Sequence, residues 1–504
     1  MDIFKQGKSS SAWIWITATF LICSLFTFAL IPGAAAQGNS DFSIPGLSPS
    51  SGTAQNRKFY SLIQSVFEFI QQHYVEEVNP QVVYEGAMNG MFNALNDPYS
   101  SFLTESDMKD MNDTTQGSFG GVGLNITQSV GPRPDGKPRY VEVVSPIEDT
   151  PGWRAGINPG DFIAEIDGTP TDTLTMDEVL GRLRGTPGVE VKLLIKRGNR
   201  MEFPVTITRA IIEVPTAKHA MIGDTGYLKL ITFTPMTAPR ARDAINEFKA
   251  NGYKNIILDL RNNYGGLLNS AVDVSGIFLD GGLVVSTKSR IPSENRNFNT
   301  RRSVLVTEDI PVIVLINRGS ASASEIVAGA LKDRSRAYLV GEKSFGKGSV
   351  QQIFPLDTAG FKITTARYYT PSNVNIDKIG IPPDREVKFP EYTEEDAVHM
   401  NELINANKIP QFAEENPKAA AAQIEAFAIT LQKEYSLDLS LLKRMIRNEL
   451  NRTVIAPVYD LEYDIQLQEA LNIFHDGLYD TLMKSTKTLK QLQEETELEL
   501  PIAS

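Results

Sequence analysis

Residues 311–356 decide the fold, and they read PVIVLINRGSASASEIVAGALKDRSRAYLVGEKSFGKGSVQQIFPL. Val312 to Ile316 and Ala337 to Gly341 are short apolar runs, and a helix-forming segment lies between them. Ile256 to Leu260 is a third run of the same kind. Continuous apolar strands are typical of a sheet that is covered on both faces. We therefore expect residues 209–392 to form an α/β domain.

The helix after the first run begins within Ser-Ala-Ser-Ala-Ser-Glu at 320–325. A serine at a strand-to-helix junction can act as a nucleophile, because the backbone N–H groups of the helix start stabilise developing negative charge. Ser322-x-x-Glu325 also fits a capping box, in which the serine only caps the helix. The spacing alone favours the cap, since serine caps far outnumber serine nucleophiles.

A serine nucleophile needs a base, and no histidine lies in the later half of this domain before His399. Lysine is the known substitute, and Lys347, between two glycines, is the candidate. Its pKa must fall from about 10.4 to near 7, which costs roughly 4–5 kcal/mol and requires burial. Ser349 and Gln351 share its face of the following strand and could orient the amine. The alternative is a solvated lysine at a turn.

Two other motifs overlap this lysine, and neither fits. Gly341-x-x-x-x-Gly346-Lys347 begins like a phosphate-binding loop, but Gly348 stands where Ser or Thr should bind magnesium, and a strand follows where a helix should start. Ser344-x-x-Lys347 has the spacing of penicillin-binding enzymes. That motif needs a helix, and its companions Ser-Asp-Asn and Lys-Thr-Gly do not occur in the sequence.

Two glycine-rich segments are candidate binding loops. Residues 258–266 leave the end of a buried strand, where α/β sheets bind their ligands, so Gly265 is a candidate oxyanion donor beside the N–H of Ala323. The alternative for this segment is a tight turn. The N–H groups of residues 117–124 could form a nest for a carboxylate, and the following strand could pair with an extended peptide. A plain glycine-rich turn is equally consistent with that segment.

The composition excludes several classes of protein. The chain has 504 residues and a formal net charge of −12, which argues against a general nucleic-acid binder because an acidic surface repels phosphate. The single cysteine, Cys23, lies in the N-terminal apolar stretch, so the folded part is expected to contain no disulfide, cysteine nucleophile or cysteine-bound metal. The four histidines are far apart, which argues against a zinc site.

Residues 1–37 are predicted to be a signal peptide or a membrane anchor. Lys5 and Lys8 precede an apolar stretch from Ala12 to Leu30, and the small residues at 34–36 form a cleavage site. The stretch is long enough to span a bilayer if it is not cleaved. Both outcomes place the rest of the chain in the periplasm or cell envelope, either free or anchored in the cytoplasmic membrane.

The rest of the chain divides into further regions on composition and periodicity. Residues 38–55 read as a flexible linker, 56–110 as an N-terminal helical region, 111–208 as a small mainly β domain and 393–504 as a C-terminal helical region. The helices at both ends have an apolar face to bury. They could pack on each other, form a homo-oligomer or bind an adaptor protein.

Together the motifs resemble those of carboxy-terminal processing peptidases, or tail-specific proteases, which are Ser/Lys-dyad endopeptidases with a PDZ domain. The resemblance covers roughly residues 56–390. It rests on Asp97-Pro98-Tyr99-Ser100, the Gly-Gly-Val-Gly-Leu loop at 120–124, Asp259-Leu-Arg-Asn-Asn, Ser320 to Glu325, Gly341 to Gly348, and Arg367 to Tyr369. It implies a crotonase/Clp-protease-like α/β catalytic core and a mainly β PDZ domain. With the helical N- and C-terminal regions that composition predicts, the expected fold is multidomain α/β.

The resemblance also implies roles for individual residues. Ser322 would be the nucleophile, Lys347 the general base and Gln351 the residue that orients it. The oxyanion donors would be Gly265 and Ala323. The free C-terminal carboxylate of the substrate would bind at Gly121, Val122, Gly123 and Leu124. No metal, nucleotide or organic cofactor is expected.

Two segments depart from the family pattern. Tyr264 stands where a proline is usual before the two glycines, and Asn373 to Ile379 replace a more polar, glycine-containing segment. The predicted function is a serine endopeptidase that recognises the C-terminal tails of exported proteins through its PDZ domain and hydrolyses peptide bonds with a Ser/Lys dyad. The alternative is a non-catalytic PDZ scaffold of the cell envelope, and the intact Ser322 and Lys347 argue against it.

Overall fold

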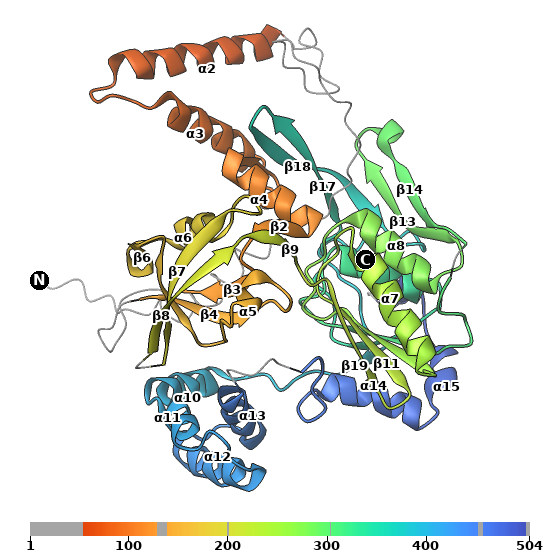
Figure 1. Ribbon diagram of the computed structural model, residues 1–504. Coiled ribbons are helices and arrows are strands. Elements are labelled where there is room, and N and C mark those ends of the chain that lie inside the picture. Colours follow the sequence, from red (N-terminus) through yellow and green to blue (C-terminus); the bar gives the residue numbers. More distant parts are fainter. Residues whose placement is uncertain (1–53, 129–138, 199–200, 303, 452–456, 500–504) are drawn as a thin grey trace, which may run out of the picture. The chain divides into compact units, whose positions relative to one another are not determined.

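The computed structural model describes residues 54–128, 139–198, 201–302, 304–451 and 457–499 (Figure 1). The predicted leader and most of the predicted linker lie outside these residues. The described residues form two compact units, each assembled from separate stretches of chain. The first unit takes in the described parts of 1–116, 216–386 and 470–504, and the second those of 117–215 and 387–469. Within the described ranges, no helix is both long enough and apolar enough to cross a membrane.

The first unit contains a six-stranded sheet. In order across the sheet, its strands are β10 (Ala217–Ile222), β11 (Thr225–Leu230), β12 (Asn255–Asp259), β15 (Val312–Ile316), β16 (Tyr338–Gly341) and β19 (Arg385–Glu386). β10 is antiparallel to β11, and the remaining neighbours are parallel. Every residue of β15 is buried, as its continuous apolar sequence predicts.

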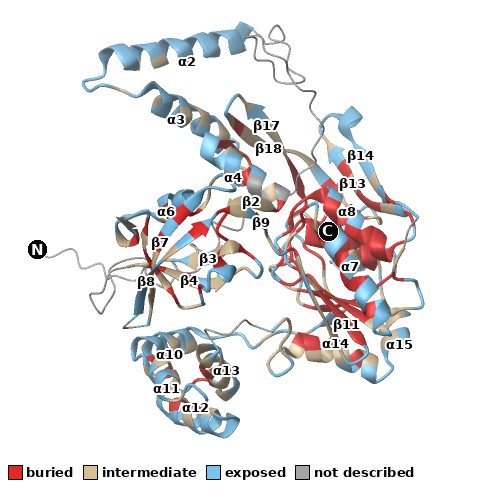
Figure 2. Ribbon diagram, viewed as in Figure 1, coloured by how far each residue is buried: buried red, intermediate tan, exposed pale blue. Residues whose placement is uncertain are grey.

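Three helices pack with this sheet and share its hydrophobic core. They are α7 (Thr237–Ala250), α8 (Leu268–Phe278) and α9 (Ala323–Asp333). Figure 2 shows buried residues along α7, α8 and the neighbouring strands. The helix predicted to follow Ser322 is α9, in which all residues from Ala323 to Lys332 are buried.

A second sheet in the first unit carries the strand that follows the predicted catalytic lysine. Its members are β1 (Ser101–Leu103), β18 (Ala359–Tyr369), β13 (Gly282–Ser289) and β14 (Arg296–Thr300), with β17 (Ser349–Leu356) also pairing with β18; a short 3₁₀ helix, η2 (Pro292–Glu294), precedes β14. Ser101 of β1 pairs with Lys362 of β18. The predicted N-terminal helical region therefore contributes a strand to the sheet of the core.

Three helices make up the rest of that N-terminal region: α2 (Ala54–His73), α3 (Pro80–Asn93) and α4 (Glu105–Gln116). Asn79 caps α3 by accepting a hydrogen bond from the N–H of Gln81 (2.9 Å). None of the residues of α2 is buried. Its predicted apolar stripe, which includes Phe59 and Ile63, is exposed (Figure 2).

Residues 117–215 of the second unit form a small β domain, for which the sequence predicts the bounds 111–208. One sheet contains β3 (Leu124–Thr127), β4 (Val141–Pro146), β5 (Phe162–Ile166), β7 (Glu190–Arg197) and β8 (Met201–Thr208), with β6 (Thr169–Pro170) beside β5, and β2 (Ser118–Gly121) pairs separately with β9 (Ala210–Glu213). The helical elements are α5 (Pro151–Arg154), η1 (Thr171–Thr173) and α6 (Met176–Leu183). Thr175 and Glu178 form a reciprocal capping box at the start of α6.

The C-terminal region is helical and is divided between the two units. The helices are α10 (Glu394–Asn405), α11 (Lys408–Glu415), α12 (Ala421–Tyr435), α13 (Leu439–Leu450), α14 (Ile465–His475), α15 (Tyr479–Met483) and α16 (Leu489–Glu499). Gly477, whose φ is 66°, follows α14 and separates it from α15. Leu489 of α16 is buried in the core of the first unit, and its N–H donates to Asp333 (2.8 Å).

Candidate active site

Ser322 lies at the junction between β15 and α9, where the sequence predicts a nucleophile. Its backbone has φ 58° and ψ −114°. A residue that merely caps a helix normally has extended backbone, whereas positive φ in a non-glycine residue costs of order 1–3 kcal/mol and concentrates at functional sites. A strained serine at a strand-to-helix turn is typical of hydrolases that use a serine nucleophile. The conformation of Ser322 therefore favours the catalytic interpretation over the cap.

Glu325 connects the turn at Ser322 to the loop that carries Lys347. Its carboxylate accepts hydrogen bonds from the N–H groups of Ser322 (2.8 Å), Gly346 (2.7 Å) and Lys347 (2.9 Å), and from the hydroxyl of Ser344 (2.6 Å). Burial raises the pKa of Glu325, and the four donors oppose this change. The carboxylate thus holds the backbones of the two predicted catalytic residues in a fixed relation to each other.

Tyr368 of β18 forms a second connection between the same two residues. Its side chain is fully buried, and its hydroxyl lies within hydrogen-bond reach of the carbonyl oxygens of Ser322 (3.3 Å) and Lys347. Burial raises the pKa of Tyr368 well above its ordinary value, so the hydroxyl keeps its proton and can donate. Glu325 therefore binds the backbone N–H groups of Ser322 and Lys347, and Tyr368 binds the carbonyl oxygens of the same two residues.

Lys347 is buried, with 5% of its surface exposed. Burial lowers its pKa to about 8, and the positive charge of Lys362 acts in the same direction, whereas Glu325 and Asp97 oppose the change. A solvated lysine at a turn would keep its ordinary pKa. An amine with a pKa near 8 is partly neutral at neutral pH, which is the state that a general base requires.

The glycines on both sides of Lys347 allow its loop to pack closely against residues 376–380. A Cβ atom on Gly346 would come within 2.9 Å of the N atom of Gly380, and a Cβ on Gly348 within 2.5 Å of the N atom of Asp377. Gly346 also has φ 93°, which side chains disfavour. Hydrogen bonds from Lys378 N–H to Gly346 O (2.7 Å) and from Gly348 N–H to Asp377 (3.1 Å) hold the two segments together.

Gln351 lies on the strand that follows the lysine and is also buried. Its amide nitrogen donates hydrogen bonds to the hydroxyl groups of Ser349 (3.0 Å) and Thr364 (3.1 Å). The N–H of Thr364 in turn donates to the hydroxyl of Ser100 (3.0 Å). The amide therefore belongs to a polar network that continues into the N-terminal region.

Gly265 lies directly against the serine turn. A Cβ atom at this position would come within 2.8 Å of the Cβ of Ser322 and 3.0 Å of the N atom of Ala323, and its φ of 109° is accessible to glycine. The two predicted oxyanion donors are thus neighbours. The N–H of Gly265 donates to the side-chain oxygen of Asn263 (3.0 Å).

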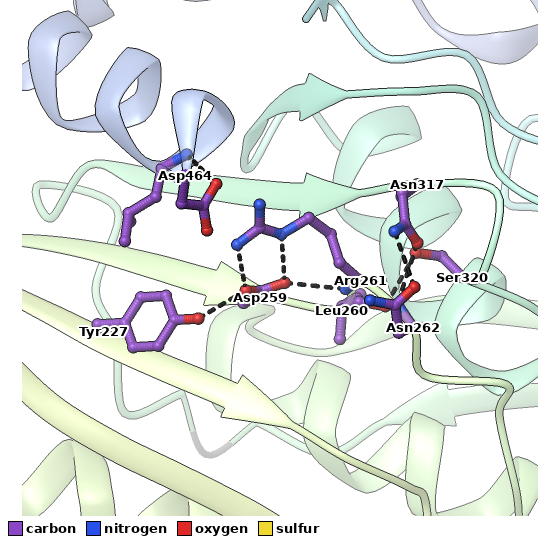
Figure 3. Close-up of polar contacts among 9 residues, drawn as sticks. Tyr227, Asp259, Leu260, Arg261, Asn262, Asn317, Ser320 and Asp464 are labelled. Carbon is purple, nitrogen blue, oxygen red and sulfur yellow. Dashed lines mark hydrogen bonds and ion pairs between the residues drawn. The ribbon is translucent and has the colours of Figure 1, made fainter. Parts of the chain in front are cut away.

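A buried ion pair supports the loop that carries Gly265 (Figure 3). The guanidinium of Arg261 donates twice to the carboxylate of Asp259 (2.9 and 2.6 Å), and the hydroxyl of Tyr227 donates to the same carboxylate (2.6 Å). Burial alone would raise the pKa of Asp259, but Arg261 and Tyr227 lower it, so Asp259 stays ionised. The pair fixes the chain where it leaves β12.

Polar contacts join this loop to the turn after β15. Asn262 and Asn317 exchange two hydrogen bonds of 3.0 Å, and the hydroxyl of Ser320 donates to Leu260 O (2.8 Å) (Figure 3). The carbonyl oxygen of Asn263 accepts from the N–H of Ala321 (3.1 Å) and the hydroxyl of Ser324 (2.7 Å). The ends of two adjacent parallel strands thereby form one rigid polar surface, at the edge of the sheet where ligands bind.

The geometry agrees with the rejection of both competing motifs. β17 follows Lys347 as a strand, so the segment lacks the helix of a phosphate-binding loop. Ser344 donates to Glu325 and accepts from the N–H of Ile381 (2.7 Å), which makes it a structural residue of the loop. No group of three or more His, Cys, Asp or Glu side chains within the described ranges is arranged to hold a metal ion.

Known proteins share this combination of elements. A model of peptidase family S41 matches residues 224–387, a PDZ domain model matches 142–197, and a model of the N-terminal domain of the activating protease CtpB matches 22–107. A carboxy-terminal-processing protease of Bartonella bacilliformis is 43% identical over 331 residues, which cover 64% of this chain and 74% of that protein. The chain belongs to the carboxy-terminal-processing protease family.

Two further proteins are similar to this chain. A carboxyl-terminal-processing protease of a Synechocystis species is 36% identical over 313 residues, which cover 60% of this chain and 71% of that protein. A photosystem II D1 C-terminal processing protease of known structure is 29% identical in sequence. The match covers 66% of this chain and 88% of that protein's chain, with a TM-score of 0.40. Membership of the family makes the chain a serine-type peptidase and confirms the predicted multidomain α/β architecture with a PDZ domain and helical terminal regions.

In the PDZ domain of this carboxy-terminal-processing protease, the predicted carboxylate-binding loop connects β2 and β3. The carbonyl oxygen of Val122 accepts from Gly152 N–H (2.7 Å), and that of Gly123 accepts from Ile147 N–H (2.9 Å). Gly123 has φ 78° and packs so closely on Thr150 that no side chain fits there. The loop backbone is therefore fixed from within its own domain.

Sequence reasoning missed two residues of the candidate site. The spacing of Ser322 and Glu325 predicts only a helix cap. It does not show that residues 344–347 supply three further hydrogen-bond donors to the carboxylate of Glu325. Tyr368 belongs to a segment that the family resemblance singled out, but nothing in a strand sequence indicates which backbone its hydroxyl will bind. Both roles depend on contacts between residues at least 19 positions apart.

Proposed function

We propose that this carboxy-terminal-processing protease is a serine endopeptidase that binds the C-terminal tails of exported proteins at its PDZ domain and cleaves them with a Ser322/Lys347 dyad. One observation carries the proposal. Lys347 is a buried lysine with a pKa lowered to about 8, and its backbone shares two buried partners, Glu325 and Tyr368, with a strained serine. This combination suits a lysine that accepts a proton from a serine hydroxyl.

In the proposed acylation step, neutral Lys347 takes the proton of the Ser322 hydroxyl while its oxygen attacks the carbonyl carbon of the substrate. The carbonyl oxygen becomes an oxyanion, which the N–H groups of Gly265 and Ala323 stabilise. For this, the Gly265 N–H exchanges its bond to Asn263 for one to the oxyanion. As the tetrahedral intermediate collapses, the C–N bond breaks, and the ammonium of Lys347 protonates the leaving amine.

Deacylation repeats these steps with water. Lys347, neutral again, accepts a proton from a water molecule that attacks the acyl ester, and it returns the proton to the oxygen of Ser322 as the acid product leaves. Gln351 is assigned the role of orienting the base, and its amide binds the hydroxyl groups of Ser349 and Thr364 beside the strand that follows Lys347. This chemistry uses protein groups and water, and the proposal includes no cofactor.

Substrate recognition is assigned to residues 121–124 and the strand β3 that follows them. An extended tail would add as a strand, with its carboxylate at the loop. The expectation of exported substrates rests on the leader-like sequence of residues 1–37, which lies outside the described residues. The exposed apolar side chains of α2 support a partner for this helix, either a second copy or an adaptor protein.

The test compares wild type with Ser322→Ala and Lys347→Ala on a protein that carries an unstructured apolar tail, and on the same protein with the tail removed. Both variants should lose at least about a thousandfold in kcat/KM, as removal of a nucleophile or base does in other serine hydrolases. Lys343→Ala is the matched control, because that lysine is a near neighbour in sequence but exposed. Equal cleavage by all four proteins would exclude the dyad.

The pH dependence tests the base directly. Because the base must be neutral and burial lowers its pKa to about 8, kcat/KM of the wild type should fall about tenfold per pH unit below pH 8. A rate that is constant from about pH 9 to about pH 5 would contradict a lysine base.

A further inference from the structure

The turn Asp97-Pro98-Tyr99-Ser100, one of the motifs that resemble the family, lies against the predicted base. The Nζ atom of Lys347 is 4.6 Å from the centre of the Tyr99 ring. The two residues are 248 positions apart, and Tyr99 comes from the N-terminal region, whereas Lys347 lies in the peptidase core. The ring is half-buried, and burial raises the pKa of its hydroxyl, which therefore stays neutral.

Hydrogen bonds hold this turn in one conformation. The carboxylate of Asp97 accepts from the N–H of Tyr99 (3.0 Å) and the hydroxyl of Ser100 (2.6 Å). Burial alone would raise the pKa of Asp97, but these donors and Thr364 lower it, so the carboxylate remains ionised. The hydroxyl of Ser100 accepts from the N–H of Thr364 (3.0 Å), and β1 begins at the next residue. Tyr99 is therefore fixed to the sheet whose strand β17 begins two residues after Lys347.

We propose that Tyr99 is a positioning residue for Lys347: its ring holds the amine of the lysine in place and stabilises its protonated form. This inference rests on the proposed role of Lys347 as the base. It makes the N-terminal region part of the active site, in addition to any role in binding partners.

The proposal follows from the charges around the amine. Burial and the charge of Lys362, on β18, disfavour the ammonium, whereas the carboxylates of Glu325, on α9, and Asp97, in the turn, favour it. The negative face of an aromatic ring attracts a cation, so Tyr99 acts in the same direction as the two carboxylates. A base whose pKa falls too far is a weaker proton acceptor. By stabilising the ammonium, the ring opposes a further fall in the pKa of Lys347.

The experiment measures kcat and KM from pH 6 to pH 10 for wild type, Tyr99→Leu and Tyr99→Phe. Leucine keeps an apolar cover over the amine but removes the ring. The midpoint of the acid limb of kcat/KM should therefore move to lower pH by about 0.5–1 unit, and the plateau of kcat should fall by a few-fold to about tenfold with KM little changed. Phenylalanine keeps the ring face, so Tyr99→Phe should retain the wild-type midpoint.

Two further proteins separate this role from a structural one. Pentafluorophenylalanine at position 99 preserves the shape of a phenylalanine ring but reverses the charge of its face, so it should shift the midpoint as leucine does, even if Tyr99→Leu is poorly folded. Tyr463→Leu removes a comparable contact, in which the guanidinium of Arg447 lies 4.4 Å from the ring, and it should leave the midpoint unchanged.

The outcomes distinguish this inference from the proposed function. Full activity of Lys347→Ala would contradict the lysine base. Lys347→Ala could lose activity while both the leucine and the fluorinated variants keep the wild-type midpoint. That result would support the proposed dyad and overturn the role of Tyr99. Activity lost in Tyr99→Leu without a shift of the midpoint, and a wild-type profile for the fluorinated variant, would show that the side chain only fills space.

Discussion

The six-stranded sheet of the first unit and the PDZ sheet of the second differ in how their strands are buried. In β15 every residue is buried, whereas in β7 buried residues alternate with exposed or half-buried ones through Ile195. The strand that leads to Ser322 is thus covered on both faces, and the PDZ strand has one face toward solvent. Proton transfer needs a fixed, water-poor site, whereas capture of a peptide needs an edge strand, such as β3 at the end of the PDZ sheet.

The two regions also use polar groups differently. At the candidate active site a buried carboxylate, Glu325, binds four donors from two segments of chain. In the PDZ domain the carboxylate of Glu178 occupies the same position of a capping box, but it is exposed and accepts two hydrogen bonds from Thr175. The same local motif is therefore a structural cap in one region and a part of the site in the other. Burial by residues distant in sequence causes the difference.

Glu325→Gln should have the largest effect on stability. The amide cannot accept all four hydrogen bonds, and its NH2 group would face donors, so the first unit should lose about 3–5 kcal/mol of stability. Cleavage should fall by at least about a hundredfold, because the backbones of Ser322 and Lys347 are no longer held together. Calorimetric unfolding and kcat/KM measure the two effects.

Glu178→Gln is the matched control for this substitution, since it changes the same capping-box position on the surface of the PDZ domain. It should change neither stability nor cleavage appreciably. Equal effects of the two substitutions would mean that Glu325 is only a cap and would remove the distinction between the regions.

Gly123→Ala should affect the PDZ domain alone. A Cβ atom would come closer than 3.0 Å to Thr150 and would strain a backbone with φ 78°, at a cost of about 2–4 kcal/mol in that domain. Binding of a tail peptide, measured by fluorescence anisotropy, should weaken at least tenfold. The rate at which a small serine-directed phosphonate labels Ser322 should remain that of the wild type.

Gly156→Ala controls for backbone strain, because Gly156 has φ 74° but no atom within 4 Å of the added Cβ. It should weaken tail binding much less than Gly123→Ala does. If Gly123→Ala slowed the labelling of Ser322 as much as it weakened tail binding, recognition and chemistry would not be separable in this way.

Lys347→Met should have the smallest effect on stability, and in the opposite direction. Burial lowers the pKa of the lysine from 10.5 to about 8, so the folded protein carries an unfavourable charge below pH 8. Removal of the amine should raise the free energy of unfolding by about 1–3 kcal/mol at pH 7, at ~1.4 kcal/mol per pKa unit. The gain should shrink as the pH rises from 8 to 10.5, because the wild-type lysine then becomes neutral in both states.

Urea unfolding at pH 7 and pH 10 measures this change, with the exposed Lys343→Met as its control. A net loss of stability at pH 7 would contradict the burial penalty on Lys347. A gain that accompanies the loss of peptidase activity would show that the site gives up stability for function.

Local sequence patterns were sufficient for much of the fold. The apolar runs at 256–260 and 312–316 correspond to β12 and β15, and the segment after Ser322 forms α9. These predictions succeed because a strand that is buried on both faces has a continuous run of apolar residues, which can be recognised in the sequence. The helical character of residues 393–504 was predicted, but the break between α14 and α15 at Gly477 was not, because apolar periodicity on both sides of a single glycine does not reveal a change of direction.

By itself the sequence determined the elements, the strand-to-helix position of Ser322 and the glycines that flank Lys347, since each follows from local composition and spacing. Only the tertiary structure decided that Glu325 binds both backbones, that Tyr99 lies against the amine of Lys347, and that the lysine is buried enough for its pKa to fall to about 8. The physical reason is that desolvation and charge act through space, and the groups that impose them here come from residues 97, 325 and 362, on separate parts of the chain.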